Sequence, residues 1–106
     1  MDDLFRMHAE ICKTFANPKR LEVINALREG EKTASELLKD INISKANLSQ
    51  HMAILIEKGV VLSRREGLKV FYKLSDKKIT MACDLMRQVL ISHLEENNRL
   101  LKKFKK

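Results

Sequence analysis

The chain has 106 residues, of which 44% are hydrophobic and 33% are charged, a balance typical of one soluble globular domain with a modest core. No apolar run approaches the ~20 residues that a transmembrane helix needs, and the amino terminus lacks the apolar segment of a secretory signal, so a cytoplasmic protein without a membrane partner is expected. The formal net charge of +7 favours an anionic partner such as nucleic acid, although basic composition alone is weak evidence for one.

A first helix is predicted over residues 2–16 and a second over residues 18–29. The first has a stripe of side chains at helical spacing: Leu4, His8, Ile11 and Phe15. The boundary falls at Asn17-Pro18, because proline disfavours helix in the residue before it and suits the first position of a new helix. Asn17 is then the expected N-cap of the second helix, and Gly30 is expected to end it.

The next stretch, residues 33–59, has the pattern of a helix-turn-helix. Thr33 and Glu36 have the spacing of a capping box, in which the threonine accepts from an amide of the first turn and the glutamate reaches back. After a short turn, Ser44 is expected to cap a second helix that ends at Gly59.

The second of these helices has two chemically different sides. Its apolar residues recur at helical spacing and can be buried together: Leu48, Met52, Leu55 and Ile56. Its other positions carry mainly short donors and acceptors: Ser44, Lys45, Asn47, Ser49, Gln50 and His51. A solvated helix usually carries long Glu and Lys side chains instead, whereas short polar groups suit the edges of base pairs. This side is the predicted DNA-reading surface.

Residues 60–75 predict a β-hairpin that turns at Glu66-Gly67, where the glycine supplies the positive φ of a tight turn. A last helix over about residues 76–103 would be ~40 Å long, more than a small domain can cover. One side of it is apolar over its length: Ile79, Cys83, Met86, Leu90, Leu94 and Leu101. Together with the stripe of the first helix, this side predicts a helix-to-helix dimer interface.

The predicted fold is therefore a single domain over residues 1–106, mainly α with a small β-hairpin. Its order of four helices, two strands and a last helix is that of a winged helix-turn-helix. Residues 33–59 form the helix-turn-helix and residues 60–75 the wing, while residues 1–16 and 76–103 form the dimerisation helices.

Four stretches in this order and spacing resemble the ArsR-type (arsenic-repressor) family of bacterial winged helix-turn-helix transcriptional regulators. They are FANPKRLEVINAL, SKANLSQHMAIL, EKGVVLSRREGLKVFYKLS and the long final helix. The resemblance implies a homodimer built on the first and last helices. It also implies that the protein binds an operator, blocks transcription, and is released when a ligand or redox change reaches the dimer.

The resemblance further implies which side chains meet DNA. The residues that would face the major groove are Lys45, Asn47, Ser49 and Gln50, and Gln50 is well suited to bidentate pairing with adenine. His51 and Lys45 are also candidates for phosphate contacts. In the wing, Arg64, Arg65 and Lys69 would lie along the DNA backbone or enter the adjacent minor groove, contacts that position a protein rather than read sequence.

The family's usual sensor sites are not intact in this sequence. Thr33 and Ser35 stand where arsenic and cadmium sensors have cysteines, and neither is a soft-metal ligand at neutral pH. In the last helix Asp84 is retained, but the other positions of a zinc or nickel site hold Met86, Asn97 and Leu100. Persulfide-responsive members have cysteines in the second and last helices. Asn25 stands at the second-helix position here, and Ile91 lies near the position in the last helix. No metal or other cofactor is therefore expected to be required.

Two cysteines remain, Cys12 and Cys83. Because the first and last helices pack together in this architecture, one interpretation is a thiol switch, or a site for trivalent arsenic or another soft metal. The alternative is that each cysteine is a small buried hydrophobe, since a reactive thiol needs an accessible, electropositive setting. Both interpretations are compatible with the sequence.

These features predict a homodimeric, sequence-specific transcriptional regulator, a repressor that a ligand or thiol-redox signal releases. One alternative is a non-specific nucleoid-type DNA-binding protein, and another is a protein-interaction module with degenerate DNA binding. An enzyme is not expected, because the sequence has no phosphate-binding glycine loop, no Cys-His-carboxylate set at a recognised spacing, and no paired carboxylates on a predicted cleft.

Overall fold

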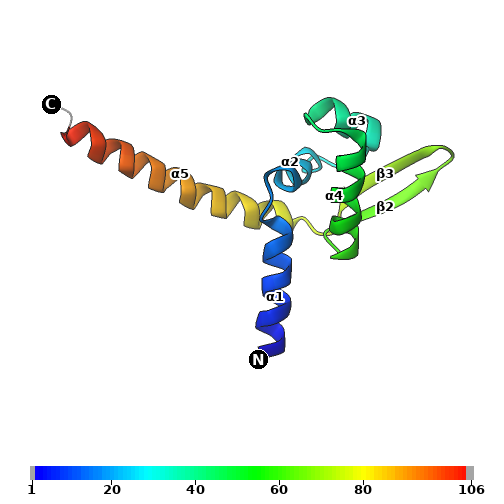
Figure 1. Cartoon of the computed structure of the whole chain (residues 1–106), viewed down its shortest axis with the longest axis horizontal. Helices are drawn as coiled ribbons and strands as arrows, with labels where there is room; N and C mark the ends of the chain where they lie inside the picture. Colours follow the sequence, from blue (N-terminus) through cyan, green and yellow to red (C-terminus); the bar gives the residue numbers. More distant parts are fainter. Residues whose placement is uncertain (1, 105–106) are drawn as a thin grey trace.

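A computed structural model describes residues 2–104 and shows a small helical body from which two helices and a hairpin project (Figure 1). The elements in chain order are α1 (Asp2–Phe15), α2 (Pro18–Ala26), β1 (Lys32–Thr33), α3 (Ala34–Asp40), α4 (Lys45–Glu57), β2 (Val61–Glu66), β3 (Lys69–Leu74) and α5 (Lys78–Phe104). This is the mainly α, winged helix-turn-helix order predicted from the sequence, with one short strand added.

Three helices begin where the sequence places capping side chains. Asn17 Oδ1 accepts hydrogen bonds from two amides of the first turn of α2, at 3.0 and 3.1 Å. Thr33 and Glu36 form a complete capping box at the start of α3. Ser44 Oγ accepts from an amide of the first turn of α4 at 3.1 Å. These oxygens satisfy amides that have no partner within the helix, so local sequence determines where α2, α3 and α4 begin.

Two helix boundaries differ from the prediction. The α-helical part of α2 ends at Ala26 rather than near residue 29, because the chain tightens into a turn in which the Gly30 amide bonds the carbonyl three residues earlier, at 3.2 Å. The last helix begins at Lys78, since Asp76 Oδ1 accepts from the Lys78 amide at 2.8 Å and thereby caps it.

The predicted hairpin forms the wing, and the sheet also contains a strand that was not predicted. β2 and β3 pair antiparallel up to Glu66 opposite Lys69, and Gly67 has the expected positive φ of 62° in the turn. β1 pairs antiparallel with the other edge of β3, which gives the order β1-β3-β2. A two-residue strand has no alternating pattern of its own, so only its pairing with β3 defines it.

The buried apolar side chains form one cluster within the helical body. They come from α2, α3, α4, the start of β2 and the adjoining turns: Val23, Ile24, Leu27, Leu37, Ile41, Leu48, Met52, Leu55, Val60 and Val61. Leu48, Met52 and Leu55 recur every three or four residues along α4, so one side of this helix is buried and its polar side faces outward.

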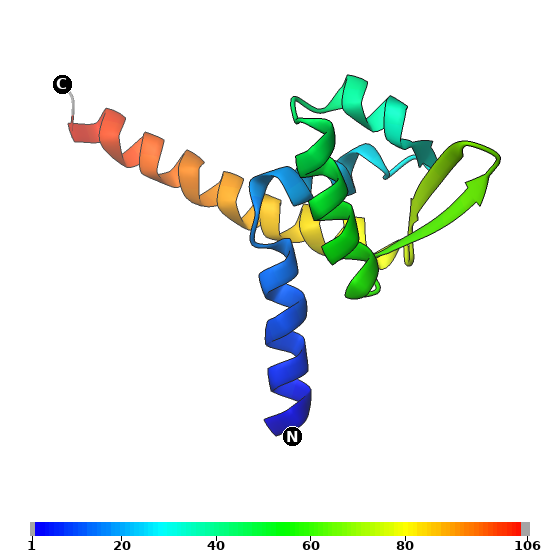
Figure 2. The same cartoon turned by 45° about the vertical axis from the view of Figure 1, so that its right-hand side comes forward.

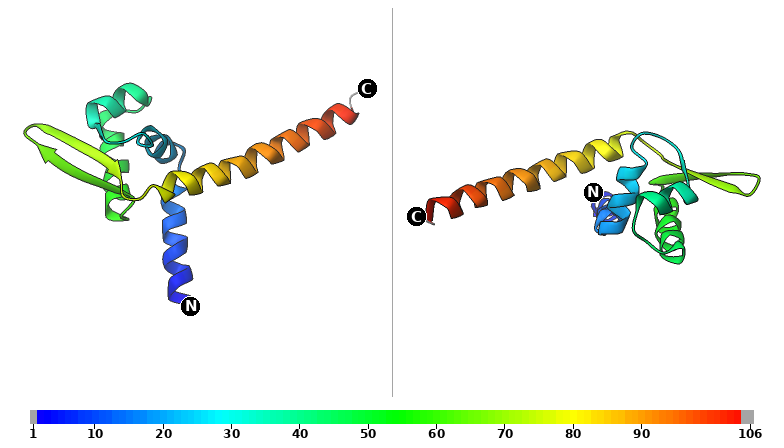
Figure 3. Two further views of the ribbon diagram at one scale, coloured as in Figure 1. Left: turned by 180° about the vertical axis from the view of Figure 1, so that it is seen from behind. Right: turned by 90° about the horizontal axis from the view of Figure 1, so that it is seen from above.

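Helices α1 and α5 extend away from this core. They diverge in Figures 1 and 2, and Figure 3 shows α5 on one side of the body and the hairpin on the other. Within one chain, the first and last helices therefore do not pack along their lengths as expected. They approach each other where α1 ends and α5 begins. Both helices leave large apolar side chains exposed: Leu4, Phe5, Met7 and Ile11 on α1, and Met81, Leu85, Met86, Val89, Leu90, Ile91, Leu94, Leu100, Leu101 and Phe104 on α5.

Replacing a side chain on the buried side of α4 should destabilise the whole domain. Leu55 is fully buried, so Leu55→Ala should lower the free energy of unfolding by about 2–5 kcal/mol through lost burial and a residual cavity. Leu62, which is 47% exposed, is the matched control, and Leu62→Ala should change the free energy by about 0.5 kcal/mol or less. Urea unfolding at one fixed protein concentration measures both values, and equal losses would contradict this assignment of the core.

Candidate nucleic-acid interface

The polar side of α4 is exposed as the sequence predicted. Lys45, Asn47, Ser49 and Gln50 are all accessible, while the intervening Leu48 lies in the core. These four side chains combine a cation, two amides and a hydroxyl on the first two turns of one helix. They can therefore offer both donors and acceptors to a surface laid against α4. Ser44 is also exposed, but its oxygen already caps the helix.

His51 is half-buried and is held in place by an arginine that the sequence analysis did not identify. Arg20 Nε donates to His51 Nδ1 at 3.2 Å, and Arg20 Nη1 donates to the Thr14 carbonyl at 3.3 Å. Because Nδ1 acts as the acceptor, a neutral His51 carries its proton on Nε2 and can donate only from there. Arg20 thus connects the end of α1 with α4.

Arg64 in the wing is engaged by two carboxylates of the same chain. Its Nε and Nη2 donate to the Glu31 carboxylate at 2.9 and 2.7 Å, and Nη1 donates to Glu66 at 2.7 Å. The guanidinium also lies over the Phe71 ring, 4.2 Å from its centroid. Hydrogen bonds to Glu31 and then Glu66 raise the pKa of Arg64, and the same contact lowers the pKa of Glu31. Arg64 therefore joins the wing to the segment before β1.

The other two wing residues predicted to meet DNA, Arg65 and Lys69, have a different environment. Arg65 and Lys69 are exposed, and neither forms an ion pair with any residue between 2 and 104. Adjacent strand residues point to opposite sides of the hairpin, so Arg64 and Arg65 occupy different faces. Arg65 stands opposite Val70 across the ladder, and Lys69 stands opposite Glu66. Lys45 of α4 likewise forms no ion pair with any residue between 2 and 104.

The two cysteines lie in unlike surroundings on the two projecting helices. Cys12 is exposed on α1, whereas Cys83 is half-buried and packs against the core from α5. Burial raises the pKa of the Cys83 thiol, which reduces its thiolate fraction at neutral pH. Both thiols are free in the structure.

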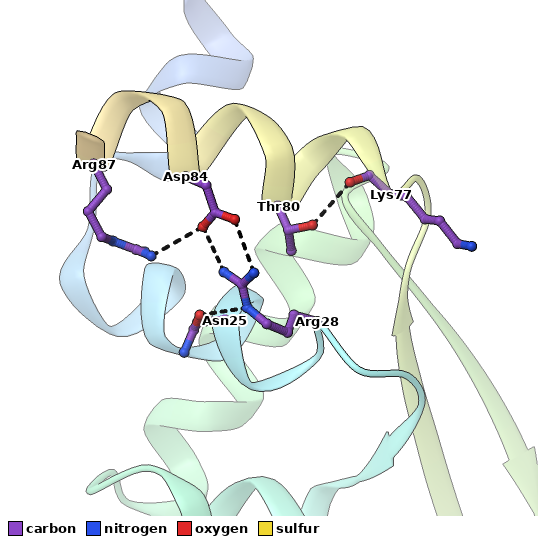
Figure 4. Close-up of polar contacts among 6 residues, drawn as sticks. All are labelled: Asn25, Arg28, Lys77, Thr80, Asp84 and Arg87. Carbon is purple, nitrogen blue, oxygen red and sulfur yellow. Dashed lines mark hydrogen bonds and ion pairs between the residues drawn. The ribbon is translucent and has the colours of Figure 1, made fainter. Parts of the chain in front are cut away.

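The retained aspartate of α5 is occupied by arginines. Asp84 accepts two hydrogen bonds from Arg28 and one from Arg87, as Figure 4 shows. Across residues 2–104 the structure contains no cluster of three or more His, Cys, Asp or Glu side chains that would suit a metal ion. The helices in the same range include none that is long and apolar enough to cross a membrane.

Comparison with known proteins connects this geometry with regulators of transcription. The sequence model of the family described as "Bacterial regulatory protein, arsR family" matches residues 17–63, which span α2, the helix-turn-helix and the start of the wing. An uncharacterized HTH-type transcriptional regulator of Mycobacterium tuberculosis is 32% identical over 101 residues, covering 94% of this chain and 89% of the relative. Its crystal structure matches with a TM-score of 0.80 and 33% identity, covering 89% of this chain and 95% of that one.

Other relatives are named for opposite effects on transcription. A biofilm growth-associated repressor of Agrobacterium fabrum is 34% identical over 84% of this chain and 75% of its own length. A transcriptional activator of Vibrio cholerae is 33% identical over 74% of this chain and 73% of its own. A homodimeric winged helix-turn-helix DNA-binding domain from Mycobacterium bovis matches with a TM-score of 0.79 and 25% identity, covering 90% of this chain and 88% of that one.

Loss of the Arg64 contacts should loosen the wing. Exchange of backbone amide hydrogens in β1 and β3 should be roughly two- to fivefold faster in Arg64→Met, the scale that exposed ion pairs support. Arg65→Met is the matched control, since Arg65 has no such carboxylate partners, and it should leave exchange unchanged.

The difference between wild type and Arg64→Met should depend on pH. Because the fold lowers the pKa of Glu31, the ion pair stabilises fully above the ordinary glutamate pKa of ~4.3, and this stabilisation is lost as pH falls through the lowered pKa. Exchange rates of the two proteins should converge toward pH 3. A difference that persists there would contradict the role given to Glu31.

Proposed function

The chain belongs to the ArsR family of bacterial regulatory proteins, and on that premise we propose that it is a homodimer that binds a double-stranded DNA operator and represses transcription by occupying it. The observation that carries the proposal is the exposed polar side of α4, held outward by the burial of Leu48, Met52 and Leu55 on its other side. The protein acts on DNA as a regulator and not as an enzyme.

In this proposal α4 lies in the major groove. The Gln50 side chain pairs with the edge of an adenine, and Asn47 and Ser49 contact neighbouring bases. Lys45, at the start of the helix, neutralises a phosphate. The proton on Nε2 of His51 gives that residue one donor for a phosphate oxygen, with Arg20 holding the ring.

The wing contributes contacts to the DNA backbone or the adjacent minor groove. Arg65 and Lys69 supply them, because both are exposed and have no carboxylate partner between residues 2 and 104. Arg64 was expected to share this role, but its three hydrogen bonds to Glu31 and Glu66 favour a different one. We assign Arg64 to holding the wing in position beside the body.

A second copy of the chain would cover the exposed apolar sides of α1 and α5. Many large apolar side chains along two projecting helices exceed what a soluble monomer ordinarily leaves in water. A two-fold symmetric dimer would place two α4 helices against successive turns of one DNA groove, ~34 Å apart. Because the operator is part of the cell's own DNA, the protein would act in the cytoplasm.

The proposal also includes a thiol signal that enters through Cys12. This thiol is exposed on a helix that the dimer would use, whereas burial raises the pKa of the Cys83 thiol and makes it a slower nucleophile. Trivalent arsenic or another soft metal that bound both thiols would join them either within one protomer or between the two protomers of the dimer. No cofactor is required for DNA binding itself.

The DNA-reading role of α4 predicts sequence preference. Wild-type protein incubated with a randomised DNA library should enrich a palindromic sequence and bind it ~10³-fold or more tightly than random DNA. Gln50→Ala should reduce that preference by roughly 10- to 100-fold. Arg65→Met should weaken both complexes alike and reduce the salt dependence by about one released ion per protomer, or about two per dimer.

The control for these changes is Arg99→Met, which removes one positive charge from α5 far from the wing. It should leave the selected sequence and the salt dependence close to wild type. DNA binding by the wild-type protein without enrichment of any sequence would identify a non-specific DNA binder. No DNA binding by the wild-type protein at all would identify an interaction module.

The thiol signal predicts a response confined to Cys12. Treatment with hydrogen peroxide or arsenite should weaken operator binding by wild type and Cys83→Ser, and should leave Cys12→Ser unaffected. Gel-shift titrations with and without the reagent measure this response. If all three proteins respond equally, or if no protein responds, there is no thiol signal. If both cysteine variants lose the response to the reagent, the site is shared by the two thiols.

A further inference from the structure

One ion pair connects the long helix α5 with the helical body, and Figure 4 shows it. Arg28, in the turn after α2, donates from Nη1 and Nη2 to the two carboxylate oxygens of Asp84, at 3.0 and 2.7 Å. Arg28 Nε donates to Asn25 Oδ1 at 3.0 Å, which orients the guanidinium. Arg87 Nη1 adds a contact of 3.3 Å to Asp84. A bidentate pair of this kind fixes the relative orientation of the guanidinium and the carboxylate as well as the distance between them.

No other ion pair among residues 2–104 joins α5 to a different element. The pairs that involve α5 otherwise, Arg87–Asp84 and Arg99–Glu96, lie within the helix itself. Apart from the ion pair, apolar packing of Ile79 and Cys83 holds the first turns of α5 against the core. The remainder of the helix projects from the body (Figure 3).

The position of Asp84 along α5 determines what this ion pair can do. The connection at residues 75–77 and the packing of Ile79 hold α5 near one end. Measured along the helix axis, Asp84 lies ~9 Å from Lys78, and Phe104 lies ~30 Å beyond Asp84. A small change of angle at Arg28 therefore becomes a displacement of several ångströms at the far end of α5.

That angle matters because α5 and α4 would serve different surfaces. The apolar side of α5 would pack on a second copy, whereas α4 would meet the DNA and shares a core with α2, next to Arg28. The angle between α5 and the body thus sets the distance between the two α4 helices of a dimer. Two recognition helices bind one operator well only when that distance matches one turn of DNA.

We infer that Arg28 and Asp84 are positioning residues, which hold α5 at the angle that spaces the two recognition helices for operator binding without touching the DNA. This inference rests on the proposed dimeric operator binding. It does not depend on the other parts of that proposal, such as the thiol signal.

The contribution of the pair to global stability should be small. Arg28 and Asp84 are 32% and 37% exposed, and ion pairs with this much access to water stabilise folds weakly. The pKa of Asp84 is lowered first by the hydrogen bonds from Arg28, so the carboxylate stays charged throughout the neutral range. Breaking the pair should therefore change geometry more than folding, and the two effects can be measured separately.

The test compares a palindromic operator, selected by the wild-type protein from a randomised library, with an isolated half-site. Asp84→Asn should weaken binding to the palindrome by roughly tenfold and leave binding to the half-site unchanged. It should also bind palindromes lengthened or shortened by one base pair with a smaller penalty than wild type does. Arg28→Met should do the same, and the double variant should lose no more than either single variant, because one contact is removed in all three.

Glu96→Gln is the matched control. It removes the same charge from the same helix and breaks an ion pair with Arg99, but it does not involve the body. It should bind both DNAs as wild type does, apart from the small gain expected from one lost negative charge.

The inference is overturned if Asp84→Asn and Glu96→Gln behave alike, if the palindrome and the half-site weaken equally, or if the losses of the two single variants add. In each case wild-type operator binding still stands, so the proposed function survives. If the wild-type protein selects no sequence, the proposed function itself fails.

Discussion

The burial of one side of α4 is the constraint on which the rest of the structure depends. Leu48, Met52 and Leu55 reach into the core from successive turns, so the helix cannot rotate about its axis without exposing them. The residues between them must then point outward whatever their chemistry. A chain with so small a core can therefore present short polar groups such as Asn47 and Gln50 in one fixed orientation, which a DNA-reading surface requires.

The same small core leaves α1 and α5 incomplete as parts of a monomer. Residues between Lys78 and Phe104 are nowhere fully buried, although apolar side chains recur along the whole helix. The chain therefore divides into a body that is packed in one copy and two helices that need another copy. This division explains why polar contacts between the parts, such as Arg20 with the Thr14 carbonyl and Arg28 with Asp84, are informative about how the parts are oriented.

The sequence was sufficient for the features that depend on neighbours in the chain. The caps at Asn17, Thr33 and Ser44, the glycine turn of the wing and the burial of Leu48, Met52 and Leu55 all follow from local chemistry, and the structure confirms them. Ile56 was predicted on the same stripe but is 38% exposed. The fold was predicted on this basis, whereas the family was predicted from the resemblance of four stretches of sequence.

The features that were missed join residues far apart in the chain. They are the pairing of β1 with β3, the carboxylate partners of Arg64, the arginine behind His51, and the contact of Arg28 with Asp84, which are 56 positions apart. A charged residue in one sequence carries no sign of which distant partner it will meet. For that reason Arg64 and Arg65, identical and adjacent, were expected to act alike, although the structure gives them different surroundings.

The order β1-β3-β2 has a consequence for how the protein behaves in a crowded solution. β1 covers part of one edge of β3, but the outer edge of β2 has no neighbouring strand among residues 2–104 and presents backbone groups that another chain could pair with. Charged side chains on an edge strand discourage such pairing, and β2 carries Arg64, Arg65 and Glu66 in succession. The charged side chains of β2 therefore have two uses, since Arg64 holds the wing to Glu31 and the charged run also protects this open edge from aggregation.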